Sequence, residues 1–527
     1  MQQQVGASAS DQVADIPAIA RGSVLNLAGV AIAGVSTLGV TVLITRAFTR
    51  PVAGAFFIAI SLFLIIETAA ALSAYNGLVY FIARLRASGQ DGRIGAILRT
   101  AILPVLVSSI AAAALVLVFA QPLARAILTG RRPGAASPAH VAAALRALAA
   151  ALPFAALLDT LLGATRGYRD MRPTVAIDQV CRSLMQLLAV LVAGLLGTAA
   201  LLAPLWALPY IPCAAAAWLW LRRIRRRALA AAAPERRGSL APSSERAAFW
   251  SFTAPRALAA GTQIVIQRLD ILLVGIIRGP VDAAIYTAAT RFLVVGQLGN
   301  AAISLAAQPQ LSRLSGLRER LAIKTVYQTT TAWVVLLTWP LYLLMVIYGH
   351  AILGIFGHSY RTGSGVIVIL GCAMLVASAC GQVDVVLISN GRSVLSLVNG
   401  LFALVVNVGV DLALIPRYGI TGAAIGWAAS IAAANVIPLA QVARVLRVHP
   451  FGAATGLACA LTGVSLGAIP LFARAVFGGD LGAQIGAVAL GCMVLAAGLW
   501  RWRDGLGLAV LRWPWIRGTG LLSVGEP

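Results

Sequence analysis

Long apolar stretches separated by short polar turns run along almost the whole chain. A helix needs about 20 mainly apolar residues to cross a bilayer, and each of these stretches has about that length. The pattern therefore predicts about fourteen transmembrane helices and an all-α, polytopic integral membrane protein. The predicted spans lie at about 23–45, 52–75, 96–120, 141–164, 174–196, 199–221, 250–277, 282–307, 325–348, 364–389, 395–415, 420–443, 452–474 and 482–502.

The composition favours the same class of protein. Of the 527 residues, 60% are apolar and 11% are charged, whereas a soluble domain carries about 25% charged residues. A soluble fold of this size could not bury so much apolar surface. The net charge of +24 does not indicate nucleic-acid binding, because a basic patch needs a soluble face to lie on. We therefore expect no nucleic-acid partner.

The distribution of arginine orients the predicted helices, because Lys and Arg accumulate in short cytoplasmic loops. With the N-terminus inside, the inner segments carry most of the basic residues, and the richest are 84–99, 222–246, 313–324 and 501–517. Residues 1–22 lack the basic region of a cleavable signal peptide, so the first span is expected to remain. We predict a multi-pass protein of the cytoplasmic membrane with both termini in the cytoplasm.

A short repeat divides the chain into two halves. Pro51–Ala59 and Pro280–Ala288 both read P-V-x-[GA]-A-[FI]-[FY]-x-A, and six predicted helices separate them. Parallel repeats of six spans occur in transporters with a cavity between the halves. The basic linker between the halves either only joins them or also binds anionic lipid head groups. The expected parts are a cytoplasmic tail (1–22), an N-lobe of six helices (23–221), the linker (222–249), a C-lobe of six helices (250–446), two C-terminal helices (447–502) and a second cytoplasmic tail (503–527).

A distinctive motif lies late in the chain, within Val398–Ser430. It contains Asn399, Asn407 and the turn Ile415-Pro416-Arg417-Tyr418-Gly419. Further short motifs occur earlier in the chain, in this order: Asn26, Gln267–Asp270, Tyr286–Arg291 and Gln308–Arg313. From about Arg21 to about Arg447, the chain resembles the polysaccharide transporter (oligosaccharide flippase) branch of the multidrug/oligosaccharidyl-lipid/polysaccharide flippase superfamily.

The resemblance implies a function in cell-surface polysaccharide biosynthesis. A flippase of this branch moves a polyprenyl-pyrophosphate-linked oligosaccharide from the inner to the outer leaflet by alternating access. The implied partners are this lipid-linked saccharide, membrane lipids and other proteins of envelope polysaccharide biosynthesis. Such transport needs no covalent step, and the sequence has no P-loop and no clustered His or Cys residues. We therefore expect no enzyme activity, catalytic residue, metal or cofactor.

Charged residues inside predicted spans are the candidate site residues, because a charge in hydrocarbon needs a partner or a water-filled cavity. Asp270 and Arg291 fall at similar depths in neighbouring spans, so we expect them to form an ion pair. Arg268 then lacks a partner, and arginine presents a fork of donors that matches phosphate oxygens. The substrate-binding candidates for pyrophosphate are Arg268, Arg256 and Arg291, although Arg256 could instead extend to the cytoplasmic surface.

Intramembrane carboxylates are candidates for coupling transport to an ion. Asp178 and Arg182 are four residues apart and are expected to pair on one face of a helix. The remaining carboxylates have no partner along their own helices, so each either binds a cation or proton or makes a polar contact between helices. The ion-coupling candidates are Glu67, Asp384 and Asp270, followed by Asp159 and Asp411.

Four other functions are compatible with parts of this pattern. A lipid II flippase also has fourteen spans and a cationic cavity, and a drug or toxin extruder of the same superfamily has the same bundle, usually with twelve. A membrane glycosyltransferase or polymerase would carry catalytic carboxylates in a large outer loop. The longest outer loop predicted here has about 20 residues and holds no Asp or Glu. A non-transporting scaffold would keep the fold without a substrate.

Overall fold

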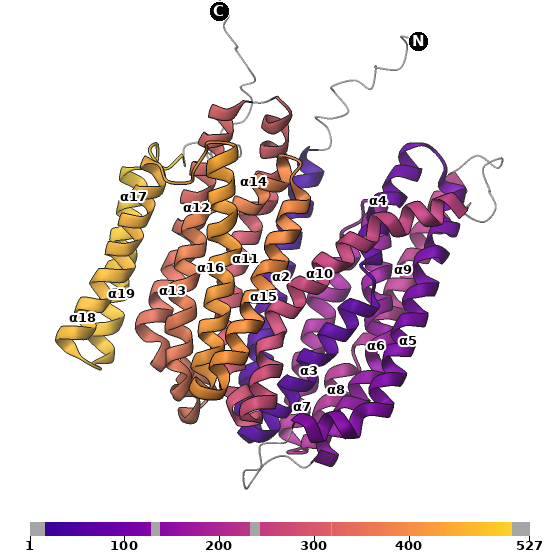
Figure 1. Ribbon diagram of the computed structural model, residues 1–527, viewed down its shortest axis with the longest axis horizontal. Coiled ribbons are helices and arrows are strands. Elements are labelled where there is room, and N and C mark those ends of the chain that lie inside the picture. Colours follow the sequence, from indigo (N-terminus) through magenta and orange to yellow (C-terminus); the bar gives the residue numbers. More distant parts are fainter. Residues whose placement is uncertain (1–15, 128–137, 232–242, 318, 508–527) are drawn as a thin grey trace, which may run out of the picture. The chain divides into compact units, whose positions relative to one another are not determined.

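The computed structural model describes residues 16–127, 138–231, 243–317 and 319–507. In these residues all regular structure is helical (Figure 1), which confirms the predicted all-α membrane fold. The helices are α2 (Ile16–Ala47), α3 (Arg50–Ala70), α4 (Ala74–Ala87), η1 (Asp91–Arg93), α5 (Ile94–Ile127), α6 (Pro138–Gly167), η2 (Thr174–Arg182), α7 (Ser183–Leu195), α8 (Ala199–Ala207), α9 (Tyr210–Ala231), α10 (Ser243–Arg278), α11 (Pro280–Gly316), α12 (Arg320–Leu353), η4 (Gly354–Phe356), η5 (His358–Gly363), α13 (Ser364–Cys380), α14 (Val383–Ser389), α15 (Ser393–Tyr418), α16 (Ile420–Val445), α17 (Ala453–Thr462), η6 (Gly463–Ala468), α18 (Ile469–Phe477) and α19 (Leu481–Arg501).

Thirteen helical segments of the described chain are long and apolar enough to cross a membrane. The helix α11 is not among these thirteen, but its 37 residues cover the eighth predicted span. Every predicted span therefore corresponds to a helix of membrane length. Several helices run past their predicted ends: α5 continues to Ile127, and α10 begins at Ser243. The predicted linker begins as helix, since α9 continues to Ala231. The linker segment 232–242 and most of both predicted tails lie outside the described residues.

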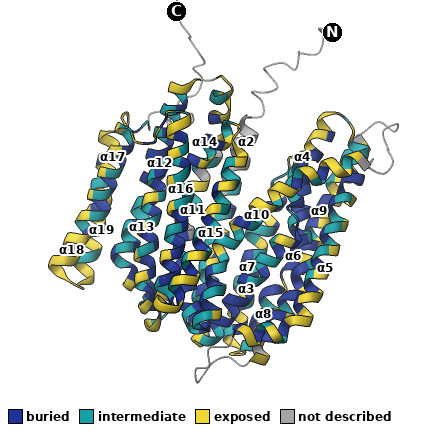
Figure 2. Ribbon diagram, viewed as in Figure 1, coloured by how far each residue is buried: buried dark blue, intermediate teal, exposed yellow. Residues whose placement is uncertain are grey.

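Side-chain burial follows the pattern expected of helices that face both lipid and protein. Figure 2 shows buried and exposed residues alternating along most helices. On α5, one face exposes large apolar side chains, including Leu103, Val107 and Ile110, while Ala101 and Val105 are buried. Apolar side chains on an outer face are stable in hydrocarbon and would be unfavourable in water.

The described chain packs as two compact units whose boundaries fall within helices. Unit 1 contains the described residues up to Leu298 together with Gly349–Leu370 and Leu397–Ala434. Unit 2 contains Gly299–Tyr348, Gly371–Ser396 and the described residues from Asn435 onward. The division of the chain into lobes at 23–221 and 250–446 stays a prediction.

Within unit 1, the two copies of the sequence repeat contact each other. Pro51 begins the first copy near the start of α3, and Pro280 begins the second copy at the start of α11. Gly54 of the first copy lies against the carbonyl of Pro280, so closely that a Cβ atom at Gly54 would overlap that oxygen. One turn further along α3, Ile58 packs against Gly275 of α10. Small residues therefore let the two repeated turns approach at backbone distance.

Unit 2 has its own apolar core. It includes Tyr327, Val386 and Leu387, which are buried and pack with Val442 and Val448. The hydroxyl of Tyr327 donates a hydrogen bond to the carbonyl oxygen of Cys380 at 2.7 Å, which satisfies the polar end of this buried ring. Such pairing is required where no water can reach the group.

Candidate functional site

Buried polar side chains of unit 1 form two clusters and one pair of arginines. The acidic cluster consists of Asp270, Tyr286, Asn407 and Asp411. The Arg182 cluster consists of Glu67, Asp159, Asp178, Arg182, Gln186 and Tyr210. The arginine pair is Arg268 and Arg291. All of these residues lie in helices of membrane-spanning length.

Three helices build the acidic cluster. Asp270 comes from α10, Tyr286 from α11, and Asn407 and Asp411 from α15, where a spacing of four places both on one face. The Tyr286 hydroxyl donates a hydrogen bond to Asp270 Oδ2 at 2.7 Å. Asn407 Nδ2 donates to Asp411 Oδ2 at 3.4 Å, and Asn407 and Asp411 lie within electrostatic range of Asp270.

The acidic cluster has more acceptors than donors. Asp270, Asn407 and Asp411 are 2%, 0% and 0% exposed, and the Oδ1 atom of each is buried without a hydrogen-bond partner. No arginine, lysine or histidine of the described residues lies within 4 Å of either carboxylate. Two neighbouring buried carboxylates without a positive charge are unstable, so this cluster is suited to hold a proton or a cation.

The predicted ion pair between Asp270 and Arg291 is not formed in the structure. Tyr286 donates a hydrogen bond to the Asp270 carboxylate instead. Tyr286, and not Arg291, lies on the face of α11 that meets Asp270. Arg291 instead lies near Arg268, close enough for the two positive charges to act on each other.

The arginine pair has no acidic partner among the described residues. The Nε atoms of both Arg268 and Arg291 are buried and have no hydrogen-bond partner. Arg268 is also within electrostatic range of Tyr210 from the Arg182 cluster. Two neighbouring guanidinium groups with free donors are the arrangement that an anion with several oxygens would stabilise.

Two other sequence candidates lie in different surroundings. Arg256 is exposed, donates to the carbonyl oxygen of Phe252 at 2.8 Å and lies over the Phe252 ring at 3.6 Å. Its side-chain hydrogen bond and its ring contact are thus both made on its own helix. Asp384 is exposed in the first turn of α14, in unit 2, where it accepts a hydrogen bond from Ser396 at 2.5 Å. Neither residue joins the clusters of unit 1.

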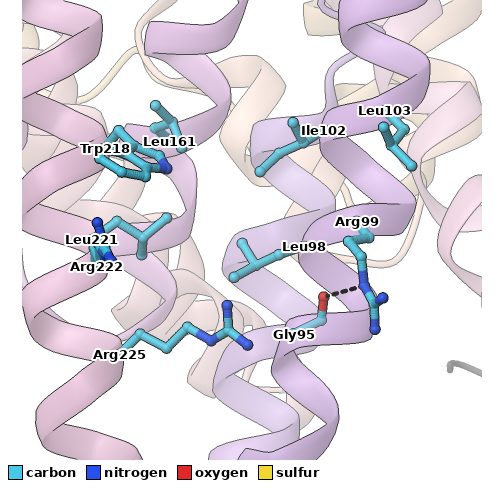
Figure 3. Close-up of a pocket in the computed structure, with 10 residues that line it drawn as sticks. All are labelled: Gly95, Leu98, Arg99, Ile102, Leu103, Leu161, Trp218, Leu221, Arg222 and Arg225. Carbon is cyan, nitrogen blue, oxygen red and sulfur yellow. Dashed lines mark hydrogen bonds between the residues drawn. The ribbon is translucent and has the colours of Figure 1, made fainter. Parts of the chain in front are cut away.

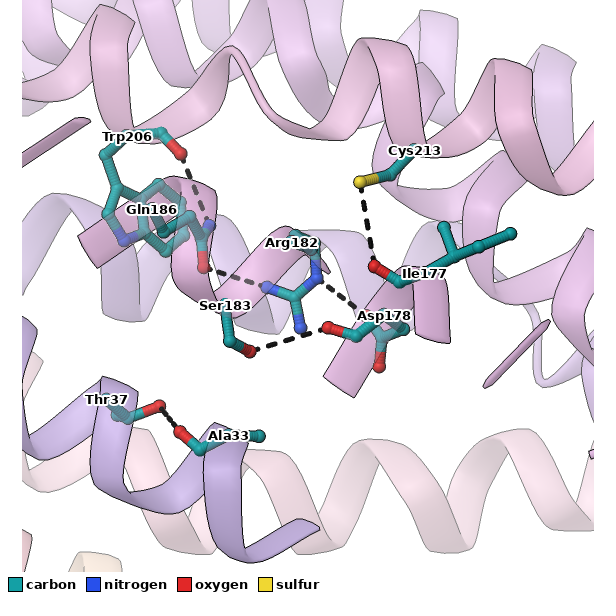
Figure 4. Close-up of polar contacts among 9 residues, drawn as sticks. All are labelled: Ala33, Thr37, Ile177, Asp178, Arg182, Ser183, Gln186, Trp206 and Cys213. Atoms are coloured by element: carbon teal, nitrogen blue, oxygen red, sulfur yellow. Dashed lines mark hydrogen bonds and ion pairs between the residues drawn. The ribbon is translucent and has the colours of Figure 1, made fainter. Parts of the chain in front are cut away.

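The Arg182 cluster is centred on the ion pair predicted from the sequence. Arg182 Nε donates to Asp178 Oδ1 at 2.6 Å, which confirms that pair (Figure 4). Arg182 Nη1 donates to Gln186 Oε1 at 3.0 Å, and Gln186 Nε2 donates to the carbonyl oxygen of Trp206 at 3.2 Å. The Arg182 guanidinium lies 5.2 Å from the ring centre of Tyr210.

The backbone at this cluster has an unusual form. Asp178 and Arg182 belong to η2, a π-helix of nine residues whose wider turns precede the regular helix α7. Such segments are rare and frequently occur at functional sites. Glu67 is buried on α3 and lies within electrostatic range of Asp159 on α6, and Asp159 in turn is within range of Asp178. The cluster therefore places more carboxylates than arginines around one half-buried guanidinium.

Tyr286 and Asn407 are not among the site residues predicted from the sequence, and Asp411 is among the last of the predicted ion-coupling candidates. One signal was available on α15, whose buried residues Asn399, Ala403, Asn407, Asp411 and Ile415 recur every four positions. A polar stripe at helical spacing inside an apolar helix indicates a buried interhelical contact. The partner from α11 had no such signal.

Comparisons with known proteins agree with this architecture. Residues 255–412, which carry Arg268, Asp270, Arg291, Asn407 and Asp411, match the family model described as MatE. No curated protein matches the chain.

Several solved structures share the fold at low sequence identity. One is an inward-facing multidrug resistance MATE family transporter of the MOP superfamily, with a TM-score of 0.67, 14% identity, and coverage of 79% of this chain and 94% of that one. Another is the lipid II flippase MurJ in an inward closed conformation, with a TM-score of 0.70, 12% identity, and coverage of 92% and 99%. A MOP superfamily transporter from Pyrococcus furiosus, reported with a binding pocket of reverse polarity, has a TM-score of 0.54, 16% identity, and coverage of 82% and 95%. The chain is thus a multi-pass membrane protein with the fold of MOP-superfamily transporters and flippases.

Proposed function

We propose that this protein is a flippase that moves a polyprenyl-pyrophosphate-linked oligosaccharide across the cytoplasmic membrane by alternating access. The observation that carries the proposal is the arginine pair. Arg268 and Arg291 lie near each other, with buried donors and no acidic partner in the described chain. A pyrophosphate has the charge and the oxygens to satisfy both guanidinium groups. The lipid tail would stay in the bilayer, and the saccharide would cross through the polar interior.

The arginine pair favours anionic substrates over cationic ones. A cationic drug would be repelled by two uncompensated guanidinium groups, which argues against extrusion of cations. A lipid II-type precursor carries the same pyrophosphate, so it is the closest alternative. The fold likeness to the lipid II flippase MurJ extends over 92% of this chain, against 79% for the multidrug transporter. The arginine pair would bind the pyrophosphate of either flippase substrate. The two substrates differ in their saccharide.

The acidic cluster supplies a means of driving transport. Binding of a proton or a monovalent cation between Asp270 and Asp411 would remove one of the two negative charges of the cluster and alter how α10, α11 and α15 pack. Because Asp270 is two residues from Arg268 on α10, loading of the cluster is coupled through one helix to the anion site. We propose that an ion gradient, and not ATP hydrolysis by this chain, drives the cycle.

Depletion of the protein in its own cells tests the proposed substrate. Lipid-linked saccharides are extracted and identified by mass spectrometry, and their leaflet is assigned with a membrane-impermeant hydrolase. Accumulation of a polyprenyl-pyrophosphate oligosaccharide in the inner leaflet is expected. Accumulation of lipid II would identify the alternative flippase. Normal levels of both lipids, with new sensitivity to toxic compounds, would overturn the proposal in favour of an extruder.

A further inference from the structure

A pocket lined by three arginines lies in unit 1, and neither member of the arginine pair lines it. It has a volume of about 720 Å3 and is lined by residues of α5, α6 and α9 (Figure 3). Arg99 comes from α5, and Arg222 and Arg225 come from α9. Figure 3 shows Arg225 extending from α9 towards Gly95 at the start of α5. The pocket has no part in the proposed transport site.

The three arginines of this pocket have no carboxylate within ion-pair distance in the described chain. The nearby acids are already engaged, since Asp91 pairs with Arg86 at 3.6 Å and Glu245 pairs with Arg93. All three pocket arginines are exposed. Their positive charge is therefore available to a ligand.

Gly95 makes room for one of these guanidinium groups. A Cβ atom at Gly95 would lie 2.5 Å from Arg225 Nη2. The Gly95 carbonyl oxygen also accepts a long hydrogen bond, 3.4 Å, from Arg99 Nε. The glycine backbone thus lets arginines from two different helices converge at one end of the pocket.

The other end of the pocket is apolar. Leu98, Ile102 and Leu103 continue the α5 wall, and Trp218 and Leu221 continue the α9 wall. Leu103 is 59% exposed and Trp218 is 48% exposed, so the apolar end opens onto the lipid-facing surface. Along both helices, the arginines lie towards the end that the arginine distribution predicts to be cytoplasmic, and the apolar residues lie deeper. Charge and apolar surface are therefore arranged in the order of a phospholipid, head group first and acyl chain after.

We propose that this pocket binds an anionic phospholipid of the inner leaflet. The phosphate lies among Arg99, Arg222 and Arg225, and one acyl chain lies along the apolar wall between α5 and α9. Basic pockets between transmembrane helices on the cytoplasmic side are suited to anionic head groups. The site holds α5 and α9 together at the point where no protein carboxylate bridges their arginines.

Native mass spectrometry of the full-length protein tests the site. The probes are palmitoyl-oleoyl phosphatidylglycerol and the matching phosphatidylcholine, added at equal concentration to delipidated protein. The test variant is Arg99→Gln/Arg222→Gln/Arg225→Gln. The matched control is Arg223→Gln/Arg226→Gln/Arg227→Gln, which removes the same charge from exposed positions of α9 that do not line the pocket.

Wild-type protein should retain phosphatidylglycerol in preference to phosphatidylcholine. The test variant should lose roughly 100-fold in affinity, because each arginine near a lipid phosphate contributes about a fivefold factor, and the control should lose much less. An equal loss in the control would show attraction by net charge alone and overturn the proposal. Equal retention of phosphatidylcholine would also overturn it, as would displacement of phosphatidylglycerol by equimolar polyprenyl phosphate, which would assign the pocket to the carrier lipid.

A second variant keeps the test decisive if the triple variant does not fold. Gly95→Ala leaves the charge unchanged and places a methyl group against the Arg225 guanidinium. It should weaken phosphatidylglycerol binding by about fivefold, the contribution of one displaced arginine. Gly486→Ala, where a Cβ atom would meet open space, is the control. Unchanged binding in folded Gly95→Ala protein would contradict the arrangement of the head-group end.

Discussion

Tyr286 donates its hydroxyl proton to Asp270 Oδ2 across 2.7 Å, and this one bond determines the chemistry of both neighbouring sites. It gives Asp270 a neutral partner, so the negative charge of the acidic cluster stays uncompensated. It also leaves Arg291 without the carboxylate that its depth in the membrane predicts. Arg291 and Arg268 are then both free to bind an anion. A tyrosine in place of an ion pair thus separates the proposed cation site from the proposed anion site along α10 and α11.

Asp411→Asn tests the cation site. The substitution keeps the volume of the side chain and removes one of the two buried carboxylates. Only Asp270 then remains to hold a proton or cation, so the cluster should bind it more weakly. Transport should lose its dependence on an imposed gradient, measured separately with proton and sodium gradients in proteoliposomes. Asp504→Asn, at a side chain that is 80% exposed, is the matched control and should transport normally. Gradient-driven transport that survives in Asp411→Asn would exclude the acidic cluster from coupling.

Arg182→Gln tests whether the second cluster is held together by its ion pair. The variant leaves the half-buried Asp178 without its partner and removes the bond to Gln186. We expect a loss of about 1.5–3 kcal/mol in the free energy of unfolding, because a half-buried charged group loses its hydrogen-bonded partner. Thermal unfolding in detergent measures it. Arg503→Gln breaks a 4.0 Å pair that is largely exposed and should change stability by less than about 1 kcal/mol. Equal stability of the two variants would show that the Arg182 pair contributes little.

Local spacing predicted part of the candidate site correctly. The Asp178–Arg182 pair lies on one stretch of helix, and a separation of four residues determines which side chains can meet. The helices themselves were predicted for the same reason, since an apolar run of bilayer length has only one way to satisfy its backbone in lipid.

Partners on different helices were not predictable in the same way. Asp270 and Arg291 fall at similar depths, but the rotation of α10 and α11 about their axes decides whether Tyr286 or Arg291 faces the carboxylate. Spacing along the chain does not contain that rotation. The proximity of Arg268 and Arg291 was also unexpected, because two like charges in a membrane are placed together only at an energetic cost.

Gly54→Ala tests the contact between the two repeated turns. A methyl group there would overlap the Pro280 carbonyl oxygen, and backbone on both sides leaves no flexible side chain to move away. We expect a loss of about 1–3 kcal/mol in the free energy of unfolding, the usual effect of overpacking. Gly456→Ala, where a Cβ atom meets nothing within 4 Å, should be neutral or slightly stabilising. Thermal unfolding of the two variants should therefore shift in opposite directions or differ clearly.

Tag accessibility tests the predicted orientation of the chain. Ala136 falls in a predicted outer loop and Ser239 in the predicted basic linker, and both lie outside the described residues. The arginine distribution places them on opposite sides of the membrane. Single cysteines introduced at these positions should react differently with a membrane-impermeant thiol reagent in intact cells, Ala136 before lysis and Ser239 only after it. Labelling of both before lysis would show that the topology is wrong.

Arg268→Ala is the sharpest test of the anion site. If Arg268 binds pyrophosphate, the variant should abolish flipping while the folded protein remains in the membrane, because no acidic side chain of the described residues loses a partner. Arg268→Lys should recover little activity, since an ammonium group cannot form the paired hydrogen bonds of a guanidinium. Arg256→Gln is the matched control on the same helix, because Arg256 is exposed and makes its side-chain hydrogen bond and its ring contact with Phe252 of its own helix.

A structural role and a binding role for Arg268 predict changes in different quantities. A structural arginine would lower membrane abundance or thermal stability by about 3–5 kcal/mol when removed, as a broken buried pair does. A binding arginine leaves abundance unchanged and raises the inner-leaflet pool of lipid-linked saccharide. Both quantities are measured in the same cells. Normal flux in a well-expressed Arg268→Ala protein would remove this residue from the site and make Arg291, the other member of the arginine pair, the next residue to test.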